Sequence, residues 1–119
     1  MRIAVSGTHC VGKSTLIEEF LRRHTEFAHE PEPYVALIED YGEEFSSQPN
    51  ADDFYRQLEF NVERLRQHKQ GESVIYERCP IDFLAYILAL KDLKMECDED
   101  AFVETIIRLV LDGMQHLDP

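Results

Sequence analysis

A loop bounded by glycines near the amino terminus has the sequence Gly7-Thr8-His9-Cys10-Val11-Gly12-Lys13-Ser14-Thr15. It follows a short apolar run over 2–6, which predicts a buried strand, and it precedes apolar residues at helical spacing over 14–24. Glycines let the backbone N–H groups of such a loop curl round phosphate oxygens, and the start of the helix adds a partial positive charge. This order of strand, loop and helix predicts a site for the phosphates of a nucleoside triphosphate.

The side chains of the loop have separate expected roles. Lys13 is expected to reach the outer phosphates, and the hydroxyl group of Ser14 is expected to ligate Mg²⁺. At His9 and Cys10 we expect the backbone to bind and the side chains to fill the loop, although a thiol near a helix start could also be reactive. The expected cofactors are ATP and Mg²⁺, and no base-recognition motif separates ATP from GTP.

The rest of the chain alternates short apolar runs with longer amphipathic stretches. Further strands are expected at 27–30 and 73–76, and further helices at 34–45, 52–70 and 80–93. The helix over 80–93 is apolar on most sides and is expected to be buried. A last helix is expected to carry Phe102, Ile106, Leu109, Val110 and Met114. The alternation predicts a single domain over 1–119, of the α/β class, with helix layers on both sides of a parallel sheet.

Charged residues follow the expected strands, and ligands bind beyond the carboxyl ends of strands in such sheets. Glu77 and Arg78 offer a metal ligand and a cation, which phosphoryl transfer needs. Glu30 and Glu32 each offer a carboxylate that could take the proton of an acceptor hydroxyl, and the sequence leaves the choice between them open. A solvated ion pair at 77–78 and ordinary surface acids at 30 and 32 are the alternatives.

The overall charge excludes some classes of partner. The chain has 24 acidic residues against 12 Lys and Arg, for a net charge of −12, which disfavours polymeric nucleic acid and anionic membrane surfaces. The cysteines at 10, 79 and 97 have no spacing typical of a disulfide framework or a zinc site. No signal peptide and no apolar run of membrane-spanning length is found, so a cytoplasmic protein is expected.

Three further features resemble the deoxynucleoside kinases. They are Glu32-Pro33 after the second strand, Gln57 seven residues before Arg64 on a long helix, and Glu77-Arg78-Cys79 after the third strand. More widely, the run Glu77-Arg78-Cys79-Pro80-Ile81-Asp82 is similar to that of other P-loop small-molecule kinases, including uncharacterised ones. The resemblance covers about residues 2–94, and Cys79 stands where the deoxynucleoside kinases have serine.

The resemblance implies a role for each matching residue. Glu32 would be the general base, Glu77 would help to bind Mg²⁺, and Arg78 would stabilise charge on the substrate or the transferred phosphoryl group. Contacts to the acceptor would come from Gln57, Arg64, Tyr34 and Phe54 or Tyr55. The alternatives are that Gln57, Arg64 and Arg66 form the solvated face of a helix, that Tyr34 and Phe54 belong to the core, and that Asp82 is a first-turn helix charge.

The end of the chain departs from the family. Related kinases would place a further strand, an arginine-bearing lid and an adenine-binding loop after Pro119, so the fold is expected to be a P-loop NTPase fold without its last strands and lid. The chain is then either part of a larger kinase or a small protein that covers its exposed face by forming a homodimer. The expected function is transfer of the γ-phosphoryl group of ATP to a hydroxyl group of a small, nucleoside-like acceptor. A nucleotide-binding regulatory domain and an NTPase that drives a partner remain the alternatives.

Overall fold

A computed structural model describes the chain except for residues 8–11, 46–49, 69–70, 93–99 and 119. Each strand is followed by one or two helices. In chain order they are β1 (Arg2–Ala4), α1 (Lys13–Arg23), β2 (Ala28–Glu30), α2 (Pro33–Tyr41), α3 (Ala51–Gln67), β3 (Val74–Tyr76), α4 (Pro80–Asp92) and α5 (Asp100–Met114). Each lies where the sequence predicts it, so the α/β assignment is confirmed.

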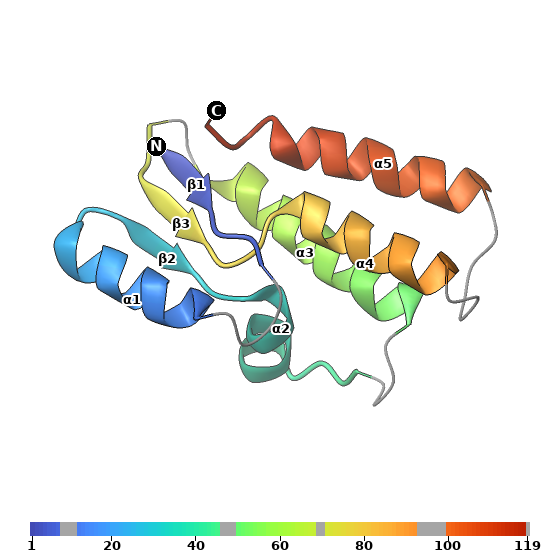
Figure 1. Cartoon of the computed structure of the whole chain (residues 1–119), viewed down its shortest axis with the longest axis horizontal. Helices are drawn as coiled ribbons and strands as arrows, with labels where there is room; N and C mark the ends of the chain where they lie inside the picture. The colour runs from blue at the N-terminus through green and yellow to red at the C-terminus, as the bar shows by residue number, and fades with distance from the viewer. Residues whose placement is uncertain (8–11, 46–49, 69–70, 93–99, 119) are drawn as a thin grey trace.

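The strands form one parallel sheet in the order β1-β3-β2. Ile3, Ile75 and His29 share one row across the sheet, and Ala4, Tyr76 and Glu30 share the next. Because side chains alternate along a strand, these two rows face opposite sides. Figure 1 shows α1 on one side of the sheet and α3, α4 and α5 on the other, which confirms the three-layer arrangement.

Two helices end earlier than the sequence predicts. α2 stops at Tyr41 because Gly42 takes a left-handed conformation with φ 66°, and its N–H group donates to the carbonyl of Ile38 at 3.2 Å. This is the hydrogen bond of an αL cap, and the next N–H group, of Glu43, donates to the carbonyl of Leu37 at 3.0 Å. α3 ends at Gln67, and Gly71, which we expected to stop it, lies in the turn that follows.

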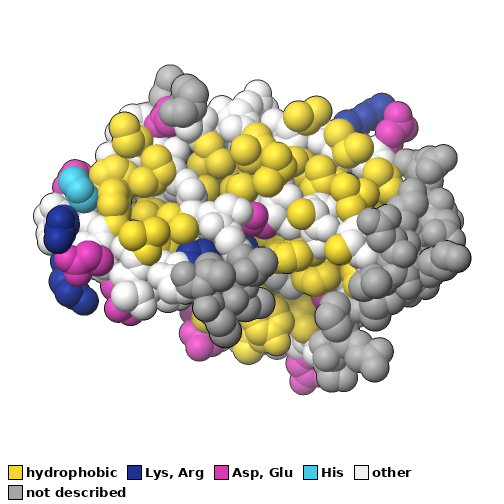
Figure 2. Space-filling model, viewed as in Figure 1, with side chains coloured by type: hydrophobic (Ala, Val, Ile, Leu, Met, Phe, Trp, Pro, Cys, Tyr) yellow, Lys and Arg dark blue, Asp and Glu magenta, His cyan; other side chains and the backbone are white. Residues whose placement is uncertain are grey.

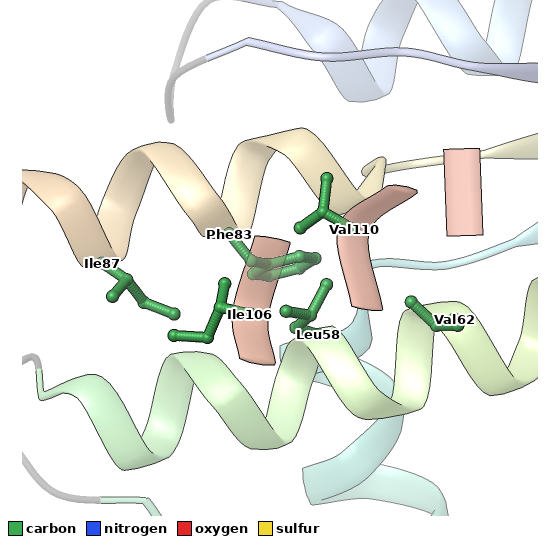
Figure 3. Close-up of a cluster of buried hydrophobic side chains, with 6 residues drawn as sticks. All are labelled: Leu58, Val62, Phe83, Ile87, Ile106 and Val110. Atoms are coloured by element: carbon green, nitrogen blue, oxygen red, sulfur yellow. The ribbon is translucent and has the colours of Figure 1, made fainter. Parts of the chain in front are cut away.

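The main hydrophobic core lies between the three long helices. Figure 3 shows the six buried side chains that meet there, two from each helix: Leu58, Val62, Phe83, Ile87, Ile106 and Val110. Full burial of one such side chain is worth about 1.5–3 kcal/mol, so this cluster is a major source of stability. A smaller cluster of Leu65, Val74 and Tyr76 joins α3 to the sheet.

One side of α4 and α5 is not covered. The exposed fraction is 50% for Ile81 and 40% for Leu88 on α4, and 40% for Ile107 and 66% for Leu111 on α5. The prediction that the helix over 80–93 is buried is therefore wrong for this side of α4. The buried side of α4 is the one that carries Phe83. Figure 2 shows hydrophobic side chains across the middle of this view, where α4 and α5 lie. Among the described helices, none is long and apolar enough to cross a membrane.

The close approach of α5 to its neighbours depends on Gly113. A Cβ atom at this position would lie 2.7 Å from Cγ of Pro80 and 2.9 Å from Cγ2 of Val62. Overpacking of this kind costs about 1–3 kcal/mol, while alanine gains about 1 kcal/mol over glycine in a helix. The rigid proline ring at the start of α4 cannot turn away, so the overpacking cost should exceed the gain.

We therefore expect Gly113→Ala to lower the free energy of unfolding by about 1–2 kcal/mol, measured by urea denaturation. Arg108→Ala, at an exposed position of the same helix, is the control and should change it by less than about 0.5 kcal/mol. A stabilised Gly113→Ala variant would show that the helices can move apart at no cost.

Candidate phosphoryl-transfer site

The carboxyl ends of the three strands meet at one edge of the sheet. The ladder continues beyond the strands, since the N–H group of Val5 donates to Tyr76 at 2.9 Å and that of Glu77 donates to Glu30 at 3.0 Å. The segments that carry Gly7, Glu32 and Arg78 therefore leave the sheet side by side. This is the arrangement that the parallel sheet predicts for a ligand site.

The start of α1 has the features of an anion-binding helix terminus. Gly12 is the N-cap residue, in a left-handed conformation with φ 81° that favours glycine, and Lys13 begins the helix. The first turn of α1 contains no acidic residue, so no carboxylate of its own neutralises the partial positive charge of the helix start. Ser14 and Thr15 are exposed there. Thr8, His9, Cys10 and Val11 lie outside the described residues, so their expected backbone contacts stay a prediction.

Glu32 lies against two cations. Its Oε1 atom accepts hydrogen bonds from Nε and Nη2 of Arg78 at 3.0 and 2.8 Å, and it lies 3.8 Å from Nζ of Lys13. The residue occupies the N-cap position of α2 but makes no side-chain cap, which leaves the carboxylate free for these contacts. Prolines on both sides restrict the backbone that holds it.

Arg78 is the most enclosed charged residue of the site, with a side chain only 2% exposed. Besides Glu32, it donates from Nη1 to the carbonyl oxygen of Gly7 at the start of the phosphate loop. The ring of Tyr86 lies over the guanidinium group at 5.4 Å, and Asn61 donates to the carbonyl oxygen of Arg78 at 3.2 Å. A solvated ion pair at 77–78, one of the alternatives, is therefore wrong for Arg78.

Asp82 joins two of the converging segments. Its Oδ2 atom accepts a hydrogen bond from the backbone N–H of Cys79 at 3.1 Å, and its Oδ1 atom accepts one from the hydroxyl of Ser6. The first contact resembles half of a capping box at the start of α4. The expected first-turn role thus fits, and the tie to Ser6 adds a link between the ends of β1 and β3. Burial raises the pKa of the Cys79 thiol, with the charge of Asp82 acting in the same direction.

The two acidic residues that compete in the sequence have different surroundings. Glu30 faces α3, where its carboxylate accepts hydrogen bonds from Arg64 at 2.9 and 2.5 Å and lies 2.8 Å from Nε2 of His68. Glu32 faces Lys13 instead. Of the two carboxylates, Glu32 is the one placed beside the phosphate loop.

The possible metal ligands are Ser14 and Glu77. The Glu77 side chain is 13% exposed and lies 3.2 Å from Nε2 of His29. In the described part of the chain, no group of three or more His, Cys, Asp or Glu residues could hold a metal ion. Mg²⁺ with a nucleotide typically uses one or two protein oxygens together with phosphates, so an exposed hydroxyl and one carboxylate fit its needs.

The expected acceptor residues lie on two helices, Tyr34 on α2 and the others on α3. Gln57 is 8% exposed, so a solvated position is wrong for it. Phe54 packs at the edge of the main core and stacks on Tyr86 at 5.1 Å. Tyr34 is 44% exposed and stacks on Phe45 at 5.3 Å, so a core position is wrong for it. Arg64 is occupied by Glu30.

Sequence reasoning missed Asn61, Tyr86 and Ser6. Two of them contact residues far away in the chain, at a separation of 17 residues for Asn61 and Arg78 and 76 for Ser6 and Asp82. Tyr86 follows Asp82 by one helical turn and Asn61 follows Gln57 by one, which gives a weak signal that each faces the same side as its neighbour. No comparable pattern marks Ser6.

Glu30 should make stability depend on pH. Its burial acts to raise the pKa of the carboxyl group, but hydrogen bonds from Arg64 and His68 outweigh burial and hold the pKa below its ordinary value of 4.5. A carboxyl group with a lowered folded-state pKa stabilises the fold above its unfolded-state pKa, and this contribution is lost as the pH falls through the folded value. The stabilisation from Glu30 is therefore present at neutral pH and disappears in acid.

We expect Glu30→Gln to lower the free energy of unfolding by about 1–3 kcal/mol near neutral pH, because the negative charge and one of the two acceptor oxygens that face Arg64 are lost. The difference from wild type should shrink as the pH falls below about 4, measured by urea denaturation across the pH range. Glu39→Gln, at an exposed position on α2, is the matched control. A difference that stays constant with pH would contradict the assigned role of the Glu30 charge.

Comparison with known protein families shows which family this chain belongs to. No curated protein and no solved structure gives a significant match. A family model described as an AAA domain matches residues 2–111, which include the phosphate loop, the three strand ends and most of α5. Since the match covers most of the chain, the protein belongs to this AAA-domain family of P-loop NTPases.

Proposed function

We propose that this domain transfers the γ-phosphoryl group of Mg-ATP to a hydroxyl group of a small, nucleoside-like acceptor. The observation that carries the proposal is the position of Glu32, whose carboxylate lies 3.8 Å from Nζ of Lys13. In a P-loop protein this lysine contacts the outer phosphates. A carboxylate beside it stands where a general base is needed to take the proton of an attacking hydroxyl.

The proposed reaction is a single displacement. The acceptor oxygen forms a bond to the γ-phosphorus while the bond from phosphorus to the β,γ-bridging oxygen breaks, and ADP leaves with that electron pair. The hydroxyl proton passes to Glu32. Lys13 offsets charge on the outer phosphates. The contacts of Arg78 with Glu32 and Gly7 use three of its five N–H groups, so two remain for charge on the transferred group.

The remaining residues support binding. Ser14 and Glu77 are the proposed Mg²⁺ ligands, and the metal would neutralise charge between the β- and γ-phosphates. Gln57, Tyr34 and Phe54 are the proposed acceptor contacts, since two of them belong to aromatic stacks and the third is a buried amide. Arg64 would have to leave Glu30 to touch an acceptor, so we assign it to holding Glu30.

A nucleotide-binding switch with little catalysis is the second candidate. One observation favours it, namely that Arg78 and Lys13 both engage the same oxygen of Glu32, an arrangement that also suits a purely structural ion pair. Both candidates predict nucleotide binding, and they differ in whether a phosphorylated acceptor is formed.

The product test uses a panel of nucleosides and other small hydroxyl compounds with Mg-ATP or Mg-GTP. We expect a phosphorylated acceptor with wild type and a decrease of about 10²–10⁴-fold in kcat with Glu32→Gln, the range typical of a lost general base. Glu39→Gln should retain wild-type turnover, because Glu39 is an exposed residue of α2 away from these contacts. Water as the sole acceptor, with an active Glu32→Gln variant, would refute the kinase proposal.

Nucleotide binding has its own test. We expect Lys13→Ala to weaken binding of a slowly hydrolysed ATP analogue with Mg²⁺ by about 10-fold or more, measured by isothermal titration calorimetry. Circular dichroism should show an unchanged fold, because Glu32 keeps its hydrogen bonds from Arg78. Undiminished binding by this variant would place the phosphates elsewhere.

A further inference from the structure

We propose that Glu32 holds Lys13 when no nucleotide is bound, and that an incoming triphosphate must take the lysine away from it. Nucleotide binding would thereby free the carboxylate to act as a base, so the nucleotide binds before the acceptor is activated. This inference rests on the proposed function in its last step. Its first step, competition between Glu32 and phosphate for Lys13, stands without any acceptor.

The contacts on Glu32 are concentrated on one atom. Nε and Nη2 of Arg78 and Nζ of Lys13 all approach Oε1. The side chain of Lys13 is 7% exposed and that of Glu32 is 17% exposed, so water screens this pair weakly. These three nitrogens crowd Oε1, so this oxygen is not open to the hydroxyl group of an acceptor while both cations remain.

The two cations are not held equally. Arg78 is 2% exposed and is fixed further by the carbonyl of Gly7 and the ring of Tyr86. Lys13 lies at 3.8 Å, beyond ordinary hydrogen-bond length, and among the described residues Glu32 is its only ion-pair partner. Its flexible chain starts at the first turn of α1, where phosphates are expected to bind. Lys13 is therefore the cation that a triphosphate can withdraw, while Arg78 stays.

This arrangement predicts that Glu32 weakens nucleotide binding. Breaking the Lys13–Glu32 contact is part of the cost of binding, so removal of the carboxylate charge should tighten it. Glutamine is the suitable replacement, because its amide oxygen can still accept from Arg78 while the negative charge that attracts the ammonium group is removed. Removal of one negative charge from a protein with a net charge of −12 would by itself favour the binding of an anion, so a matched control is needed.

The experiment compares wild type, Glu32→Gln and Glu39→Gln for binding of a slowly hydrolysed ATP analogue with Mg²⁺, by isothermal titration calorimetry. Glu39 is exposed on α2, the helix that Glu32 caps, so its variant accounts for the change in net charge. We expect Glu32→Gln to bind about 3- to 10-fold more tightly than Glu39→Gln. Equal affinities of the two variants would overturn the proposal.

A second background separates competition from simple repulsion between Glu32 and phosphate. With Lys13→Ala present, no lysine needs to be released, so Glu32→Gln should give no gain over Glu39→Gln. Ligand-induced shifts in Tm at high analogue concentration can follow this weak binding. A gain of the same size with and without Lys13 would mean repulsion alone and would overturn the proposal.

Stability without nucleotide provides a further check, which also applies if binding to the Lys13→Ala background is undetectable. The Tm losses of Lys13→Ala and Glu32→Gln should be non-additive, with the double variant retaining about 2–4 °C more than their sum predicts. Additive losses would mean that the two residues do not interact in the free protein and would overturn the proposal. If these results support it but no acceptor is phosphorylated, then the kinase proposal alone fails.

Discussion

The site depends on a guanidinium group that is removed from water. Arg78 joins three segments that the sheet brings to one edge, through Gly7 beyond β1, Glu32 beyond β2 and its own position after β3. Burial of a lone guanidinium group would cost several kcal/mol, so the two neighbouring segments must supply its partners. A change that separates one segment from the others leaves a buried charge without compensation, and this requirement fixes their relative positions.

Side chains of α3 and α4 contact Arg78 and support its position. Asn61 reaches from α3 to the backbone carbonyl of Arg78, and Tyr86 reaches from α4 to the guanidinium face. Asp82 joins the start of α4 to Ser6. Because α3 and α4 also share the main hydrophobic core, the packing of that core is transmitted to the position of Arg78 and, through it, to Glu32.

The sequence predicts elements well where periodicity and turn chemistry are local. The three strands and the five helices follow from patterns within about 10–20 residues. The residue pattern alone left the choice between Glu30 and Glu32 open, and only the resemblance pointed to Glu32, since the position of Glu30 depends on Arg64 and His68, which lie 34 and 38 residues from it. Nor could the composition of the helix over 80–93 show that Ile81 and Leu88 face outward, because apolar residues on most sides do not identify the covered side.

The charges at the site explain how an acidic protein can bind an anion. Lys13 and Arg78 contribute two positive charges, and Glu32, Glu77 and Asp82 contribute three negative charges within the same set of strand ends. Asp82 is occupied by two hydrogen bonds and Glu32 by two cations, whereas Glu77 contacts the imidazole ring of His29. A bare triphosphate would meet a nearly balanced site, whereas a complex with Mg²⁺ brings the positive charge that Glu77 can receive. In the proposed function, these acidic surroundings would favour the metal–nucleotide complex over the free nucleotide, and the local arrangement of charge would matter more to binding than the net charge of −12.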